Sequence, residues 1–172
     1  GGVIALASLT ATIILLLEGE FLYACLLAPL LGGVLGFLPF NLYPSRIFMG
    51  DGGSLFAGVI LSTLIIKASQ KASLGISLLV PLGILALPIL DTSLAFIRRA
   101  LKGTSPFKPD AEHIHHRFLR KGYSEEQVVR LLLGVSAFFS LLAVLTYSLP
   151  YQFRLGVVVV FFLLILWLLT TL

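Results

Sequence analysis

Long apolar runs, separated by short polar stretches, follow one another along the whole chain. A helix needs about 17 to 25 apolar residues to cross ~30 Å of hydrocarbon. Six runs approach or reach that length, and they cover residues 3–17, 21–37, 55–66, 74–97, 128–149 and 155–172. The run at 55–66 is short, and we expect its helix to begin inside the preceding loop, which carries little charge. The pattern predicts an all-α bundle of about six membrane spans.

Composition excludes a water-soluble protein. Of the 172 residues, 58% are apolar and only 12% are charged, and the mean hydropathy is +1.06. This is more apolar surface than a soluble core of that size buries. The single cysteine, Cys25, lies within the second run and is interpreted as a packing residue. We therefore expect no disulfide bond within these residues.

The distribution of Lys and Arg predicts the orientation, because short cytoplasmic loops are enriched in them. One long loop holds Arg46, and the loop two runs later is strongly basic. The basic residues of this later loop are Arg98, Arg99, Lys102, Lys108, Arg117, Arg120, Lys121 and Arg130. The remaining turns hold only Lys67, Lys71 and Arg154. We place the two long loops, about 38–54 and 98–127, in the cytoplasm together with both termini.

The first long loop reads FNLYPSRIFMGDGGSLFAG, residues 40–58. Asp51 is its only carboxylate, and glycines on both sides permit a ligand to approach the backbone closely. Ser54 is expected to N-cap the third helix, whose first N–H groups and positive dipole end would favour an anion. The alternative is a plain glycine turn in which Asp51 is a second cap. Spacing alone does not decide between a phosphate site and a turn.

The second long loop contains all three histidines, in PDAEHIHHRFLRKGYS at residues 109–124. His113, His115, His116 and Arg117 can all bind phosphate, and Asp110 precedes them. A helix would place the first and third histidines on one face, whereas an extended stretch would pair the first two. Two other interpretations stay open. They are a zinc site, although no second Cys or distant His is present, and a solvated loop with incidental histidines.

A helix is expected to resume after the histidines. Ser124 and Gln127 have the spacing of a capping box, and two glutamates between them favour the positive end of the helix dipole. One acidic residue, Asp91, lies inside an apolar run and follows Pro81 and Pro88. The prolines predict a kinked or broken helix, in which the acid either caps the second half or faces the same cavity as Asp51.

These two loops resemble the motifs of a known family, the polyprenyl-phosphate N-acetylhexosamine-1-phosphate transferases of glycosyl transferase family 4. There a Phe-Met-Gly-Asp stretch precedes a Gly-Ser helix start, as in residues 48–54, and a histidine loop follows. The sequence is closer to the branch that uses UDP-N-acetylglucosamine for wall teichoic acid, O-antigen and lipopolysaccharide-type glycans. The muramoyl-pentapeptide branch of peptidoglycan synthesis, which lacks the Pro109-Asp110 lead, is the alternative.

The resemblance implies roles for individual residues. Asp51 would bind Mg²⁺, with Mn²⁺ as an alternative cofactor, and the histidine loop would hold the sugar diphosphate. The implied catalytic residues are Asp51, His115 and His116. The implied substrate-binding residues are Asn41, Gly50, Asp110, His113, His115, His116 and Arg117.

The implied reaction is attack by an oxygen of a membrane polyprenyl (undecaprenyl) phosphate on the β-phosphorus of a UDP-sugar. It yields polyprenyl-diphosphate-sugar and releases UMP. The implied location is a bacterial-type cytoplasmic membrane, with the site facing the cytoplasm. UDP-sugar, polyprenyl phosphate and membrane lipid are the expected partners, and no nucleic acid is expected. Whether a single chain or a homodimer acts is left open.

The sequence departs from the family pattern in one respect. Family members carry an aspartate pair and a second loop that ends in an Asp-Gly-Leu-Asp-Gly-like stretch, and neither is present here. Gly1-Gly2 would be the tail of that second motif, so we expect a C-terminal part of a longer enzyme without transferase activity of its own. A secondary transporter with a proline-broken helix and a non-catalytic membrane scaffold remain as other classes.

Overall fold

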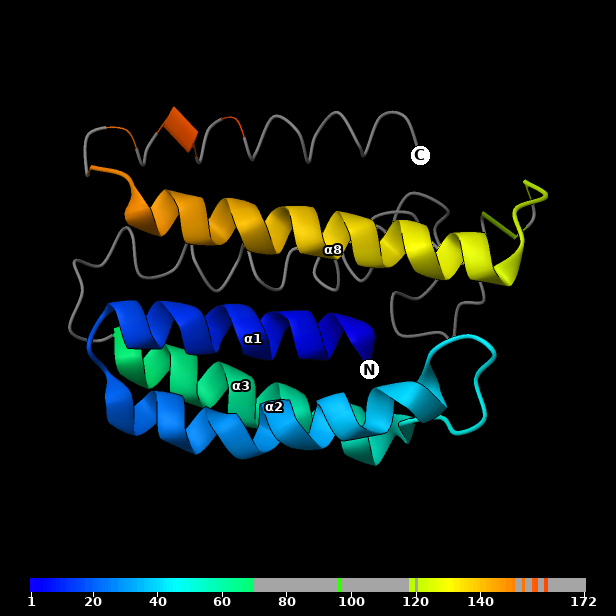
Figure 1. Ribbon diagram of the computed structural model, residues 1–172, viewed down its shortest axis with the longest axis horizontal. Helices are drawn as coiled ribbons and strands as arrows, with labels where there is room; N and C mark the ends of the chain where they lie inside the picture. The colour runs from blue at the N-terminus through cyan, green and yellow to red at the C-terminus, as the bar shows by residue number, and fades with distance from the viewer. Residues whose placement is uncertain are drawn as a thin grey trace.

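A computed structural model describes the backbone of residues 1–69, 96, 118–119, 121–150, 153, 156–157 and 160. Four helices lie in this part of the chain, and no strand does. They are α1 (Gly2–Leu17), α2 (Phe21–Asn41), α3 (Gly50–Ser69) and α8 (Glu125–Ser148). The described part therefore confirms the all-α architecture (Figure 1).

The helices match four of the six predicted runs, and two boundaries differ from the prediction. α2 continues to Asn41, and α3 begins at Gly50, inside the preceding loop as expected. The intervening loop is therefore 42–49 rather than 38–54. Most of the fourth run and most of the sixth lie outside the described residues.

Three described helices have the length and apolar composition of a membrane span, and α1 is a shorter apolar helix of 16 residues. Only 17% of the apolar window of α2 is buried within the protein. Large apolar side chains such as Phe21 and Leu22 on α2 and Phe56 on α3 are accordingly exposed. An outward face of this kind is stable in hydrocarbon, so the chain is an integral membrane protein.

α1 is the centre of the described bundle, because it contacts α2, α3 and α8. Its inward face carries small side chains, such as Ala7 and Ala11, which permit close approach of membrane helices. The core is completed by larger apolar residues of α2 and α3, including Leu27 and Leu61.

The helices run lengthwise, and their ends define two ends of the bundle (Figure 1). The turn between α1 and α2 lies at one end. At the other end lie the chain start, the 42–49 loop and the beginning of α8 (Figure 1). Gly1 approaches Asn41 there, and Gly2 approaches Leu133 of α8. The described parts of the two long loops therefore share one end, as the alternation of spans predicts.

The turn before α8 combines two helix-terminal motifs. Tyr123 N–H donates to the Phe118 carbonyl and Gly122 N–H donates to the Leu119 carbonyl, which is the Schellman pattern, with Gly122 at φ 90°. The Phe118 and Tyr123 rings meet edge to face, with centroids 5.6 Å apart. The predicted capping box then starts α8 and is confirmed, because Ser124 and Gln127 exchange both bonds. A helix thus ends and the next begins within a few residues.

Candidate functional site

The loop between α2 and α3 is closed at its base by hydrogen bonds. The Phe40 carbonyl accepts from the N–H groups of Arg46 at 2.9 Å and Ile47 at 3.0 Å. The side chain of Asn41, the last residue of α2, donates through Nδ2 to the Ile47 carbonyl at 3.0 Å. These bonds return the chain to the end of α2 before α3 begins. The loop that precedes Asp51 is therefore held at both ends.

The start of α3 presents Asp51 at this end of the bundle. Gly50 has φ 68°, in the left-handed region that favours glycine. Asp51 follows in the first turn and is exposed. A carboxylate is electrostatically favourable there, because the first N–H groups of a helix carry partial positive charge. The sequence prediction that this residue lies beside a helix start is confirmed.

Ser54 does not cap α3, and that prediction is wrong. The helix begins four residues earlier, so Ser54 lies inside it. Its hydroxyl donates backwards to the carbonyls of Gly50 at 3.0 Å and Asp51 at 3.1 Å. The physical reason is that the glycines 52 and 53 adopt helical geometry, although glycine has low helix propensity. Ser54 thus tightens the turn that carries Asp51.

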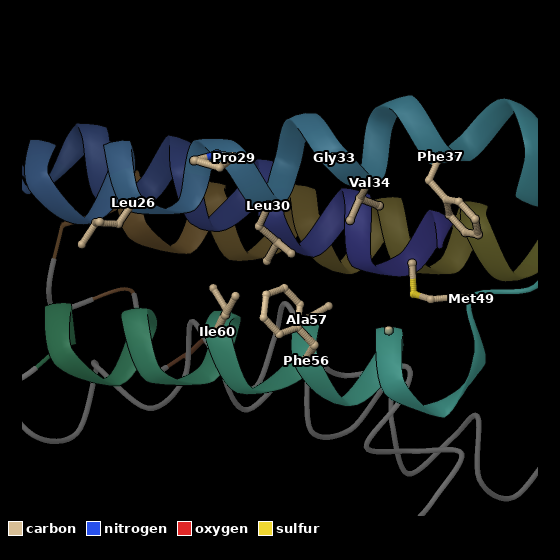
Figure 2. A pocket seen from close by; sticks show the side chains of 11 residues that line it. Leu26, Pro29, Leu30, Gly33, Val34, Phe37, Met49, Phe56, Ala57 and Ile60 are labelled. Carbon is tan, nitrogen blue, oxygen red and sulfur yellow. The ribbon is translucent and has the colours of Figure 1, made fainter.

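The position of the Met49 side chain explains why residue 53 is a glycine. A Cβ added at Gly53 would lie 2.7 Å from the Met49 Cγ, a distance that real Cβ atoms do not show. The Met49 side chain therefore lies directly on the first turn of α3 (Figure 2). Among the described residues, no heavy atom outside the helix lies within 4 Å of a Cβ placed at Gly52, so the contact with Met49 is specific to position 53.

An apolar groove runs between α2 and α3 (Figure 2), with a volume of about 370 Å³. Its lining residues are Leu26, Pro29, Leu30, Gly33, Val34, Phe37, Met49, Gly53, Phe56, Ala57 and Ile60. On α3 they recur at spacings of three and four and so form one face. Asp51 precedes Gly53 by two residues, a rotation of roughly 200° about the helix axis. The carboxylate and the groove therefore belong to opposite faces of α3.

The other predicted site residues lie outside the described residues. They are Asp110, His113, His115, His116 and Arg117, together with Asp91. The described residues that follow them are Phe118 and Leu119, which end in the Schellman motif just before α8. That motif lies at the same end of the bundle as the 42–49 loop (Figure 1). The structure therefore places Asn41, Gly50 and Asp51 at the same end of the bundle and leaves the histidines as a prediction.

The loop that precedes Asp51 carries two exposed side chains, Arg46 and Phe48, that the sequence motifs did not identify as site residues. Phe48 is 83% exposed, the most exposed of the large apolar side chains described. Arg46 is also exposed and belongs to the same loop. An aromatic residue inside a short loop that carries a cation, a carboxylate and glycines is the signal that could have revealed Phe48. Within the described ranges, no three His, Cys, Asp or Glu side chains come together as a metal site.

Comparison with known proteins agrees with the motifs. Residues 1–69 match glycosyl transferase family 4. A probable undecaprenyl-phosphate N-acetylglucosaminyl 1-phosphate transferase of Bacillus subtilis is 37% identical over 81% of this chain and 39% of its own length. A decaprenyl-phosphate N-acetylglucosaminephosphotransferase of Mycobacterium leprae is 37% identical over 70% of this chain and 35% of its own.

A third relative, the undecaprenyl-phosphate alpha-N-acetylglucosaminyl 1-phosphate transferase of Escherichia coli, is 30% identical over 84% of this chain and 41% of its own length. No solved structure matches the chain significantly. The chain spans about two fifths of the length of the curated relatives it matches. On these matches and on its two loop motifs, the chain belongs to glycosyl transferase family 4.

Proposed function

We propose that the full-length protein transfers N-acetylglucosamine-1-phosphate from UDP-N-acetylglucosamine to a membrane polyprenyl phosphate and releases UMP. The observation that carries this proposal is Asp51, held exposed in the first turn of α3 at one end of a membrane bundle. The relatives supply the chemistry, because their names specify a polyprenyl phosphate and N-acetylglucosamine 1-phosphate. The muramoyl-pentapeptide alternative has no support among these names.

The geometry suits a reaction between a lipid and a water-soluble nucleotide. The start of α3, which carries Asp51, lies at one end of the apolar bundle (Figure 1). If the helices span a bilayer, this end lies at the level of the lipid headgroups. A polyprenyl phosphate anchored in the bilayer reaches that level without leaving it, and a nucleotide sugar reaches it from solution. A transporter would instead need its site near the middle of the bilayer.

Asp51 fits a magnesium ion. Mg²⁺ commonly binds one or two protein carboxylates and completes its coordination with water and substrate phosphates. Asp51 offers one exposed carboxylate in the first turn of α3, which suits such a site. When bound, the ion would neutralise phosphate charge. Mn²⁺ accepts the same oxygen ligands and is the alternative.

Different residues of the chain would bind different parts of the substrates in the proposed transfer. The positive end of α3 and Arg46 attract the anionic diphosphate, and the exposed ring of Phe48 offers a stacking surface for the nucleotide base. His113, His115, His116 and Arg117 would hold the diphosphate from the second loop. An oxygen of the lipid phosphate then forms a bond to the β-phosphorus. The bond to the α-phosphate oxygen breaks, and its electron pair leaves with UMP. Positioning and charge neutralisation are the main sources of rate in such transfers.

The test is transfer of labelled sugar phosphate by the full-length protein in membranes. We expect lipid-linked sugar and UMP in equal amounts, and we expect Asp51→Asn to lower the rate by at least about 100-fold, the scale of a lost electrostatic group. Glu20→Gln, the same chemical change at the opposite end of α2, is the control and is expected to keep activity. Absence of the product, or full activity of Asp51→Asn, would overturn the proposal.

A further inference from the structure

Among the described residues, three hydrogen bonds close the base of the 42–49 loop, and one of them uses a side chain. Two are backbone bonds to the Phe40 carbonyl, which any sequence could make. The third runs from Asn41 Nδ2 to the Ile47 carbonyl, across six residues. A side-chain bond of this kind depends on residue type. Among the uncharged side chains of similar size, only asparagine offers a planar N–H donor at this reach.

The other half of the same amide lies against the beginning of α1. A Cβ added at Gly1 would lie 2.5 Å from the Asn41 Oδ1, so the amide oxygen occupies the space beside that glycine. Asn41 therefore meets the protein on both sides, with Ile47 at its nitrogen and Gly1 at its oxygen. These contacts on both sides fix the orientation of the amide.

We propose that Asn41 is a positioning residue that acts through the loop, and not the substrate ligand that the family resemblance implies. The proposal rests on the transferase function proposed above. Ile47, whose carbonyl accepts the hydrogen bond from Asn41, is separated from Asp51 only by Phe48, Met49 and Gly50. Two of them are constrained, since Met49 lies on α3 and Gly50 holds a left-handed conformation. Fixing Ile47 thus fixes the carboxylate.

The consequence for catalysis follows from distance. A misplacement of about 1 Å in a reacting group can lower a rate by about a hundredfold. Loss of one neutral hydrogen bond shifts a local equilibrium by about fivefold, which corresponds to about 1 kcal/mol. An open loop would therefore be populated in Asn41 variants, and only the closed fraction would hold Asp51 in place.

The first experiment reads the loop directly. A spin label is placed at Ser45→Cys, an exposed loop position, in the full-length protein with Cys25→Ala. We expect Asn41→Ala and Asn41→Asp to lower the ratio of immobile to mobile label by about fivefold. Asn41→Gln keeps the donor and is expected to recover part of the immobile signal. Tyr43→Phe, a change on the half-exposed side chain of a neighbouring loop residue, is the control and leaves the spectrum unchanged.

The second experiment measures transfer in the same variants. We expect activity to follow the order Asn, Gln, then Ala and Asp, in parallel with the immobile fraction of the label. A loss of activity with an unchanged label spectrum would show that Asn41 binds substrate and would overturn the proposal, as would a spectrum and an activity that both stay unchanged. If the unsubstituted protein has no transferase activity, the proposed function fails. The spin label still decides whether Asn41 holds the 42–49 loop closed.

Discussion

The Met49 side chain constrains the helix turn that carries Asp51, and a double-mutant cycle can measure this. Gly53→Ala is expected to lower stability by about 1 to 3 kcal/mol, the cost of overpacking, because the new Cβ would meet the Met49 Cγ at 2.7 Å. Truncating Met49→Ala should remove most of that cost. Thermal unfolding of the four proteins in lipid nanodiscs gives the coupling. Gly52→Ala, where the space is open, is the matched control. Equal losses at positions 52 and 53 would contradict the steric explanation.

Phe48 gives a second test at the scale of one residue. Its ring is 83% exposed, and base stacking on an aromatic ring contributes about 1 to 3 kcal/mol. Phe48→Ala is therefore expected to raise KM for the UDP-sugar about tenfold, with the KM for polyprenyl phosphate nearly unchanged. Phe48→Tyr keeps a ring and should behave like the original. Equal effects on both substrates would argue for a loop defect in place of a lost stacking surface.

At the scale of elements, the joint between the histidine loop and α8 is built from residue types that cannot be exchanged freely. Gly122 has φ 90° and closes the Schellman motif. Gly122→Ala is expected to cost about 1 to 2 kcal/mol, since a Cβ is strained in the left-handed region. Thermal unfolding measures the loss, and Lys121→Ala, one residue earlier, is the control. An unchanged melting temperature in Gly122→Ala would show that the motif contributes little.

The elements were predictable to the extent that burial in lipid determines them. Hydropathy located α1, α2, α3 and α8, because twenty apolar residues in hydrocarbon must be helical. It did not locate the start of α3, where glycines 50, 52 and 53 read as a loop although the structure places them in the helix. The capping box at Ser124 was predictable, because both of its partners lie within four residues.

In the candidate site, too, local features could be predicted from the sequence and contacts between distant residues could not. Asp51 was identified because a lone carboxylate among glycines is visible in the sequence. The bond from Asn41 to Ile47 was not predicted, since it depends on how the whole loop folds back. Contacts that cross helices, such as Gly1 against Asn41, need the packed bundle and leave no local pattern.

At the scale of the whole molecule, two of the described helices that follow a loop begin at the same end of the bundle. α3 and α8 both start where the 42–49 loop lies (Figure 1). Their N-terminal ends carry partial positive charge, and together with Arg46 they make this end attractive to anions. Glu18 and Glu20 lie in the turn at the opposite end. Glu125 and Glu126 offset the positive end of α8, so the parts of this end that favour binding of a nucleotide diphosphate are the start of α3 and Arg46.

The distribution of Lys and Arg along the chain predicts how the protein lies in the membrane. Basic loops remain in the cytoplasm, where nucleotide sugars are made, so Ser45→Cys should react with a membrane-impermeant maleimide only from that side. Glu18→Cys, exposed at the opposite end, should react only from outside, and Cys25→Ala removes the thiol of these 172 residues. Labelling of intact cells compared with inverted vesicles separates the two. If residue 45 reacts from outside, the Asp51 turn would face away from the nucleotide pool. The proposed reaction would then need a donor that the outer side of the membrane does not supply.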